Sequence, residues 1–277
     1  MTEIALRQRG PRDTALDPSL STLARRVIAG TYGLVNHGSF VVAVAAMAWG
    51  LYHGMSQEGV PHLQVGLEGG WRWLWNALLL LQFPLIHSWL LTARGRRFMA
   101  RLAPFGTGRT LGATIYTTLA SWQILFAFSA WVPIGKASWS PEGWLLHAWQ
   151  VLFAGCWLFL VKALKDGGMT LQTGSLGWMA LWKGERPRFP GLRTQGTFAA
   201  CRQPIYLAFA SLLWTGPVWT ADHLAVAGLW TVYCLVGPIH KERRFQSMYG
   251  DAFITYKSRI PYFVPRLKGR SRTPQRP

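Results

Sequence analysis

Charged residues are scarce in this chain. They make up only 14% of its 277 residues, against roughly 25% in ordinary soluble domains. Hydrophobic residues account for 50%, so there are too few charged side chains to cover a water-exposed surface. Among the charged residues the acidic ones are the fewer: there are 11 Asp and Glu and 29 Lys and Arg, which gives a formal net charge of +18. The composition therefore excludes an ordinary water-soluble globular domain.

Cysteine is also rare, with three residues at positions 156, 201 and 234 and no CxxC spacing. Cys156 and Cys234 lie inside apolar runs, where a free thiol behaves as a small apolar side chain. We expect neither a structural disulfide nor a zinc site. The chain also lacks a glycine-rich dinucleotide motif, a P-loop, an HExxH motif and any internal repeat. Its first 26 residues lack the apolar core and cleavage site of a signal peptide, so no cleaved signal is expected.

The chain does contain long apolar runs. Each of four is close to the ~20 residues that a helix needs to cross a bilayer. They are 27–52, 71–92, 112–133 and 144–164. A fifth run, 205–239, is too long for one helix and is interrupted at Gly216 and Pro217, which predicts two helices joined by a tight turn. We therefore predict an all-α integral membrane protein with about six helical segments: four spans and a C-terminal helical hairpin.

The basic residues predict the orientation of these spans. They are concentrated in the tail 1–26, in 93–111, in 165–204 and after residue 239, whereas the alternate connections carry only Lys136. Loops rich in Lys and Arg stay in the cytoplasm. Both termini and both basic loops are thus expected to be cytoplasmic. The positive charge is assigned to orientation and to attraction to anionic lipid, and no nucleic-acid partner is expected.

Two of the basic regions have patterns of their own. The glycine-rich segment 165–204 contains an apolar stretch at 176–182 that predicts a short interfacial helix. The segment 240–265 begins with the spacing of an amphipathic helix, which predicts a cytoplasmic C-terminal helix. Long patterned connections of this kind often carry function.

The residues of 196–206, GTFAACRQPIY, resemble the G-x-Y-x-x-x-R-H-P-x-Y motif of the isoprenylcysteine carboxyl methyltransferase and phospholipid methyltransferase superfamily. The end of the chain is similar to that superfamily's ending, E-E-x-x-L-x-x-x-x-G-x-x-Y-x-x-Y-x-x-R-V-P-x-x-x-P. The residues in register with it are Glu242, Phe245, Gly250, Phe253, Tyr256, Arg259, Pro261 and Pro265. Within the superfamily, 75–265 looks most like the bacterial methanethiol S-methyltransferases and their NnrU-like relatives.

This resemblance implies a membrane methyltransferase of the bacterial inner membrane that uses S-adenosylmethionine and no metal. Its acceptor would be a small hydrophobic or lipid-dissolved molecule, with a thiol favoured. Arg202 and Glu242 are the implied catalytic residues. The implied cofactor-binding residues are Arg193, Gly196, Arg202, Gln203, Pro204, Tyr206, Glu242 and Tyr256. Glu242 would neutralise the cofactor's amino group, the two arginines would hold its carboxylate, and Tyr206 or Tyr256 would face its sulfonium or adenine.

The resemblance also implies a division of the chain into four parts. These are a cytoplasmic tail (1–26), a four-span region (27–164), a cofactor-binding region that includes the hairpin (165–265), and a basic tail (266–277).

Three positions depart from the superfamily pattern: Gln203 replaces His, Lys241 replaces Glu, and Ala208 replaces Gly. A glutamine cannot act as a base near pH 7. A thiol needs no strong base, because its pKa is about 8.5 and the thiolate is a strong nucleophile. The departures thus favour a thiol acceptor, or else a non-catalytic NnrU-like accessory protein or carrier on the same scaffold. A remoter alternative is an NADPH-dependent enzyme similar to sterol reductases.

Polar residues at membrane depth are a further class of candidates. His87 and Gln82, together with Asn76, are expected to form interhelical hydrogen bonds or to line a substrate cavity. Haem ligation is the alternative, because His37, His87 and His147 lie in three different spans. No helical spacing relates these histidines, so we predict no metal.

Overall fold

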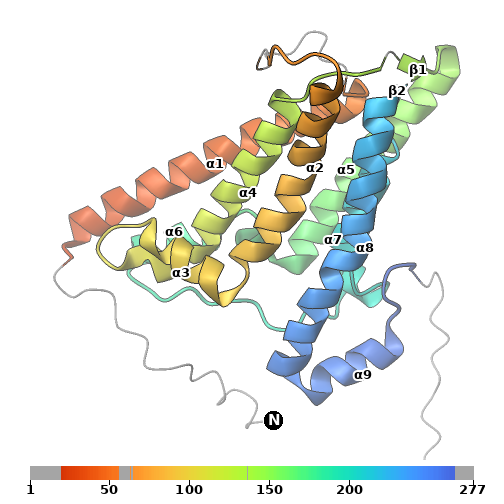
Figure 1. The fold of residues 1–277 in the computed structure, drawn as a ribbon. Helices are drawn as coiled ribbons and strands as arrows, with labels where there is room; N and C mark the ends of the chain where they lie inside the picture. The colour runs from red at the N-terminus through yellow and green to blue at the C-terminus, as the bar shows by residue number, and fades with distance from the viewer. Residues whose placement is uncertain (1–19, 56–62, 64, 136, 266–277) are drawn as a thin grey trace, which may run out of the picture.

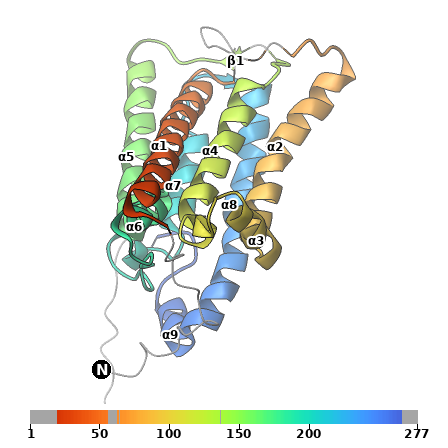
Figure 2. The same cartoon turned by 90° about the vertical axis from the view of Figure 1, so that its left-hand side faces the viewer.

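The computed structural model describes residues 20–55, 63, 65–135 and 137–265. Most of the predicted N-terminal tail (residues 1–19) and the predicted basic tail (266–277) lie outside these ranges. The long helices run roughly side by side in both views (Figures 1 and 2). They are α1 (Thr22–Tyr52), α2 (Gly70–Leu90), α4 (Gly112–Ser129), α5 (Gly143–Gln172) and α8 (Ala221–Tyr249), with the shorter α7 (Pro204–Leu213) among them.

Short elements occupy the two ends of this bundle. Helices α3 (Ala93–Arg101), α6 (Ser175–Lys183) and α9 (Asp251–Arg259) lie at one end (Figure 1). At the other end, β1 (Ala137–Trp139) pairs antiparallel with β2 (Trp219–Thr220), which an all-α prediction did not include. Over the described ranges there are also two 3-10 turns, η2 (Thr107–Arg109) and η3 (Gly196–Ala199). A core of large apolar side chains, among them Leu51, Phe128, Trp131, Phe153 and Trp230, joins the long helices.

Apolar helices of membrane-spanning length confirm the multi-pass character of the chain. By length and composition, α1, α5 and α8 can each cross a bilayer, and α2 with α3, bent by 89° at their junction, is either a broken fourth span or a re-entrant segment. Helix α4, which covers the third predicted span, is not among them. The predicted count of four spans plus a hairpin is therefore not confirmed.

The polar character of α4 has a structural reason. Its Thr114 hydroxyl donates to the carbonyl oxygen of Gly174 at 2.6 Å, and its Thr118 hydroxyl donates to Asn36 Oδ1 of α1 at 3.2 Å. Asn36, fully buried, in turn donates to the carbonyl oxygen of Thr173 at 2.8 Å. Helix α4 is thus less apolar because it bonds to α1 and to the start of α6 through buried polar groups.

The predicted hairpin is confirmed, but its second helix is longer than expected. Helix α7 ends at Leu213 and α8 begins at Ala221, as the break at Gly216 and Pro217 indicated. Helix α8 then continues through Pro238 to Tyr249, so the helix predicted to begin at 240 is the last part of α8. The separate C-terminal helix is α9, after Gly250. A proline removes one intrahelical hydrogen bond and need not end a helix that neighbours pack against. The predicted short helix at 176–182 corresponds to α6.

Candidate functional site

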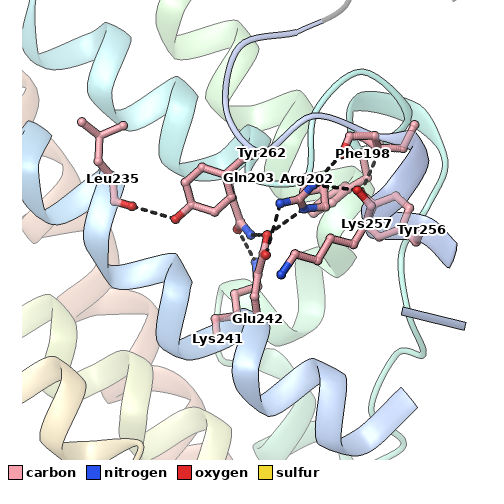
Figure 3. A network of polar contacts seen from close by, with 10 residues as sticks. Phe198, Arg202, Gln203, Leu235, Lys241, Glu242, Tyr256, Lys257 and Tyr262 are labelled. Atoms are coloured by element: carbon pink, nitrogen blue, oxygen red, sulfur yellow. Dashed lines mark hydrogen bonds and ion pairs between the residues drawn. The ribbon is translucent and has the colours of Figure 1, made fainter. Parts of the chain in front are cut away.

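An ion pair between two distant parts of the sequence marks the site. Arg202 precedes α7, and Glu242 lies on α8. Arg202 Nε donates to Glu242 Oε1 at 2.8 Å, and its Nη2 donates to Oε2 at 3.3 Å. Each side chain is only 9% exposed. This two-point geometry is the strong form of an arginine–carboxylate pair. The two residues that the motifs single out as catalytic are therefore in direct contact (Figure 3).

The same arginine holds the end of the described chain in place. Arg202 Nη1 donates to the carbonyl oxygens of Lys257 and Ile260 at 3.1 and 2.6 Å, and its backbone N–H donates to Pro261 at 2.9 Å. The guanidinium carbon lies 5.5 Å from the ring centre of Tyr262. Four of the five N–H groups on the guanidinium are thus engaged within the protein. One remains for the cofactor carboxylate that Arg202 is predicted to bind.

The two departures from the family motif at this site contact each other. Gln203 Nε2 donates to Glu242 Oε1 at 2.9 Å, and Lys241 Nζ donates to Gln203 Oε1 at 3.2 Å. Lysine, glutamine, glutamate and arginine therefore form one continuous chain of hydrogen bonds (Figure 3). Gln203 and Lys241 therefore belong to the same polar network as Arg202 and Glu242.

The Lys241 ammonium faces aromatic rings. Its Nζ lies 5.5 Å from the ring centre of Phe245, 5.6 Å from that of Tyr206 and 6.0 Å from that of Phe198. These are cation–π distances. We call the three rings the aromatic cage. Tyr206, predicted to face the cofactor, is thus turned toward a cation of the protein itself.

A cavity of about 340 Å³ adjoins the ion pair. Its volume falls within the range of small-molecule sites. It offers one carboxylate, several cationic groups, an amide and an aromatic ring. The lining residues are Arg202, Ile239, Glu242, Arg243, Gln246, Lys257 and Tyr262. These groups together suit a ligand that carries an ammonium, a carboxylate and a flat ring.

Five of these lining residues were not among the predicted site residues. Gln246 could have been found, because it follows Glu242 by four residues and so shares its helix face. Lys257 and Tyr262 carry no such signal, since only the folding of the segment after α8 brings them to the cavity.

Two of the residues predicted to bind the cofactor, Arg193 and Pro204, are not among the cavity-lining residues. Arg193 is exposed and does not line the cavity; its Nη2 is 3.6 Å from the position that a Cβ on Gly168 would take. Pro204 occupies the first turn of α7, where its fixed φ and missing N–H suit a helix start.

Tyr256 also has a packing role. Its hydroxyl donates to the carbonyl oxygen of Phe198 at 2.7 Å, and the residue is 8% exposed. Burial raises the pKa of Tyr256 above its usual value, so the hydroxyl keeps its proton. Tyr256 thereby fixes the turn that carries Phe198 of the aromatic cage.

Gly196 permits a close approach of a carboxylate, which leads to a stability prediction. Its φ is +62°, and an added Cβ would overlap the carboxylate of Asp166, which accepts the N–H of Thr197 at 2.7 Å. We expect Gly196→Ala to lower the free energy of unfolding by about 1–3 kcal/mol, measured by thermal unfolding in detergent. Gly191→Ala is the control, because nothing lies within 4 Å of its Cβ position. Equal melting temperatures for the two variants would contradict this role.

The predicted interhelical hydrogen bonds of α2 are confirmed. Tyr116 Oη and His87 Nε2 are 2.6 Å apart, and Gln123 of α4 donates to Gln82 Oε1 at 3.1 Å. Neither His87 nor Gln82 lines the cavity beside Glu242. Trp178 Nε1 donates to His37 Nε2 at 3.1 Å, and His147 pairs with Gln150. Over the described ranges, no group of three His, Cys, Asp or Glu side chains is placed to hold a metal ion.

The long apolar helices define a helical multi-pass membrane protein, and its buried Arg202–Glu242 ion pair lies beside a cavity of about 340 Å³. Methanethiol S-methyltransferase 2 of Bradyrhizobium diazoefficiens is 30% identical over 204 residues, which cover 73% of this chain and 76% of that protein. Methanethiol S-methyltransferase 1 of the same organism is 28% identical over 69% of this chain and 66% of its own length. A methanethiol S-methyltransferase of a Pseudomonas species is 25% identical over 70% and 75%.

The chain belongs to the bacterial methanethiol S-methyltransferase family, a family of membrane methyltransferases related to the isoprenylcysteine carboxyl methyltransferases. No family model matches the chain. No solved structure matches it either.

Proposed function

We propose that this protein is a membrane methyltransferase that transfers a methyl group from S-adenosylmethionine to a small hydrophobic or lipid-dissolved acceptor, with a thiol as the favoured class. The observation that carries the proposal is the placement of Glu242. Its carboxylate is held by Arg202 and Gln203 at the wall of a cavity of ligand size. The names of the relatives support the reaction class and the choice of a thiol.

The cavity residues fit the cofactor by their chemistry. Glu242 would bind the cofactor's ammonium, since each carboxylate oxygen has two acceptor positions and Oε2 accepts one hydrogen bond from the residues that the structure describes. Arg243 and Lys257 would bind its carboxylate, with the last N–H of Arg202. The ring of Tyr262 offers a face for the adenine.

The proposed chemistry asks little of side chains other than positioning. Bound S-adenosylmethionine supplies an electrophilic methyl group on a sulfonium. Holding the two reactants in line and excluding water supplies much of the acceleration in such a displacement. The Arg202–Glu242 pair gives this positioning a rigid base, because it fixes the start of α7, the C-terminal part of α8 and the segment after α9 against one another.

We place the cavity on the cytoplasmic side of the membrane. It lies at the end of the bundle that carries α9, and α3 and α6 lie at the same end (Figures 1 and 2). Helix α3 alone contains four arginines, and α9 ends with Lys257 and Arg259. This concentration of positive charge supports a cytoplasmic position for both termini.

The test is isothermal titration of the detergent-purified protein with S-adenosylmethionine and S-adenosylhomocysteine. We expect the wild type to bind both and Glu242→Gln to bind both about 10- to 100-fold more weakly, because an ionic hydrogen bond is worth about 1.5–3 kcal/mol. Glu185→Gln makes the same chemical change at an exposed position and is the matched control. It should bind as the wild type does.

The same titration separates the alternatives. Equal affinity in wild type and Glu242→Gln would reject the site. Absence of binding to a folded wild-type protein would reject the methyltransferase proposal in favour of the accessory protein or carrier. Binding of NADPH in a parallel titration would instead favour the reductase.

A further inference from the structure

The Lys241 ammonium has no acidic partner inside the protein. Among the residues that the structure describes, no carboxylate forms an ion pair with it, and its one hydrogen bond is to the neutral amide oxygen of Gln203. The carboxylate of the adjacent Glu242 is bound to Arg202 and Gln203. Lys241 is therefore a cation set among aromatic rings with its charge uncompensated at close range.

The groups that face Lys241 come from three elements. The turn η3 contributes Phe198, and α7 contributes Tyr206, with Gln203 at the N-cap position just before this helix. Helix α8 contributes the ring of Phe245 and two charges of opposite sign, Glu242 and Arg244, which interact with Lys241 over longer distances. Glu242 and Arg244 act on the lysine in opposite senses, and neither forms an ion pair with it among the residues that the structure describes.

Removing an ammonium group partly from water costs free energy, and packing contacts alone do not explain why a lysine occupies this position. Aromatic rings replace only part of the hydration that an ammonium loses when it leaves water. The apolar faces of the same rings suit a hydrophobic molecule. The cage thus combines an apolar enclosure with one positive charge, which is complementary to a small apolar anion.

We infer that the aromatic cage binds the methyl acceptor as a thiolate, with its sulfur at the Lys241 ammonium. This inference rests on the proposed function and names the form of its acceptor. Gln203 supports the placement, because its amide bonds to Lys241 on one side and to Glu242 of the cavity wall on the other. The acceptor and cofactor positions are thereby adjacent.

The reaction balances with this assignment. The bound thiol loses its proton to solvent, and the thiolate's electron pair forms the new carbon–sulfur bond. The pair from the broken bond stays on the former sulfonium sulfur, which becomes a neutral thioether. When the pKa of a bound alkyl thiol falls toward neutrality, a larger fraction of it is ionised, but each thiolate is less nucleophilic. The second effect is the smaller one, because the logarithm of the rate constant changes with thiol pKa with a slope of only about 0.4–0.5. The net rate therefore rises.

The binding test compares two probes of nearly the same shape, para-nitrothiophenolate and its neutral methyl thioether, para-nitrothioanisole. No cofactor is present. We expect wild type and Lys241→Arg to prefer the thiolate, and Lys241→Met, an unbranched uncharged side chain one atom shorter than lysine, to lose about 10-fold of that preference. An unchanged preference in Lys241→Met would overturn the inference, and so would a wild type that binds neither probe.

The kinetic test uses thiols of different acidity. With an alkyl thiol at pH 7, Lys241→Met should react on the order of 10-fold more slowly than wild type, and the difference should shrink at high pH and with an acidic aryl thiol. An equal loss for every thiol at every pH would indicate a structural role and reject the inference.

Cofactor affinity by titration is the internal control. A wild type that binds no cofactor contradicts the proposed function, whereas one that methylates thiols without dependence on Lys241 contradicts only this inference.

Discussion

Replacing Arg202 with alanine is expected to destabilise the folded protein by about 3–5 kcal/mol. Removal of one member of a buried ion pair leaves the other charge unpaired, and this cost is of that size. Here the remaining charge is Glu242, 9% exposed. The substitution also frees the carbonyl oxygens of Lys257 and Ile260. The effect should therefore be concentrated in α9 and the residues that follow it.

Two measurements check this expectation. Thermal unfolding in detergent reports the global loss, and hydrogen exchange should show a larger increase in α9, whose Lys257 carbonyl accepts from Arg202, than in α1. Arg202→Lys keeps the charge but not the planar fork, so it should recover only part of the stability. Adding Glu242→Gln to Arg202→Ala removes the unpaired charge and should also restore part of it. A double variant no more stable than Arg202→Ala would show that the ion pair is not the source of the effect.

The apolar pattern predicts much of the fold because membrane burial acts on whole segments. The runs at 27–52 and 144–164 correspond to α1 and α5, and the break at Gly216 corresponds to the turn between α7 and α8. The third predicted span corresponds to α4 but is not confirmed as a membrane span, because α4 is less apolar and uses Thr114 and Thr118 to bond to neighbouring segments. Hydropathy cannot distinguish such pairing from an amphipathic surface.

The candidate site was predictable to a similar degree. The two motifs identify Arg202 and Glu242, and the structure brings them into contact. Motif matching could not separate residues that face the cavity from those that shape the backbone, such as Gly196 and Tyr256. Nor could it show that Gln203 and Lys241 bond to each other, since that contact depends on how α7 packs against α8.

A second buried acid, Asp222, stabilises the opposite end of α8. It is 3% exposed and accepts three hydrogen bonds. The donors are Trp131 Nε1 at 3.1 Å and the backbone N–H groups of Ile134 and Gly135, each at 3.0 Å. In the sequence Asp222 is only an acidic residue in a turn. In the structure it joins the connection after α4 to the first turn of α8, where a negative charge also interacts favourably with the helix dipole.

We expect Asp222→Ala to lower the free energy of unfolding by about 3 kcal/mol, because it removes the carboxylate that accepts three hydrogen bonds, two of them from the partly exposed residues Ile134 and Gly135. The matched control is Asp251→Ala, which removes an exposed acid from the first turn of α9. Cofactor affinity should not change in folded Asp222→Ala, since position 222 lies 20 residues before Glu242 along α8, about 30 Å in a helix. Thermal unfolding tests the predicted loss of stability, and cofactor titration tests the predicted unchanged affinity. A variant as stable as the control would refute the clamping role of Asp222, and a folded variant with weakened binding would show that the two ends of α8 are coupled.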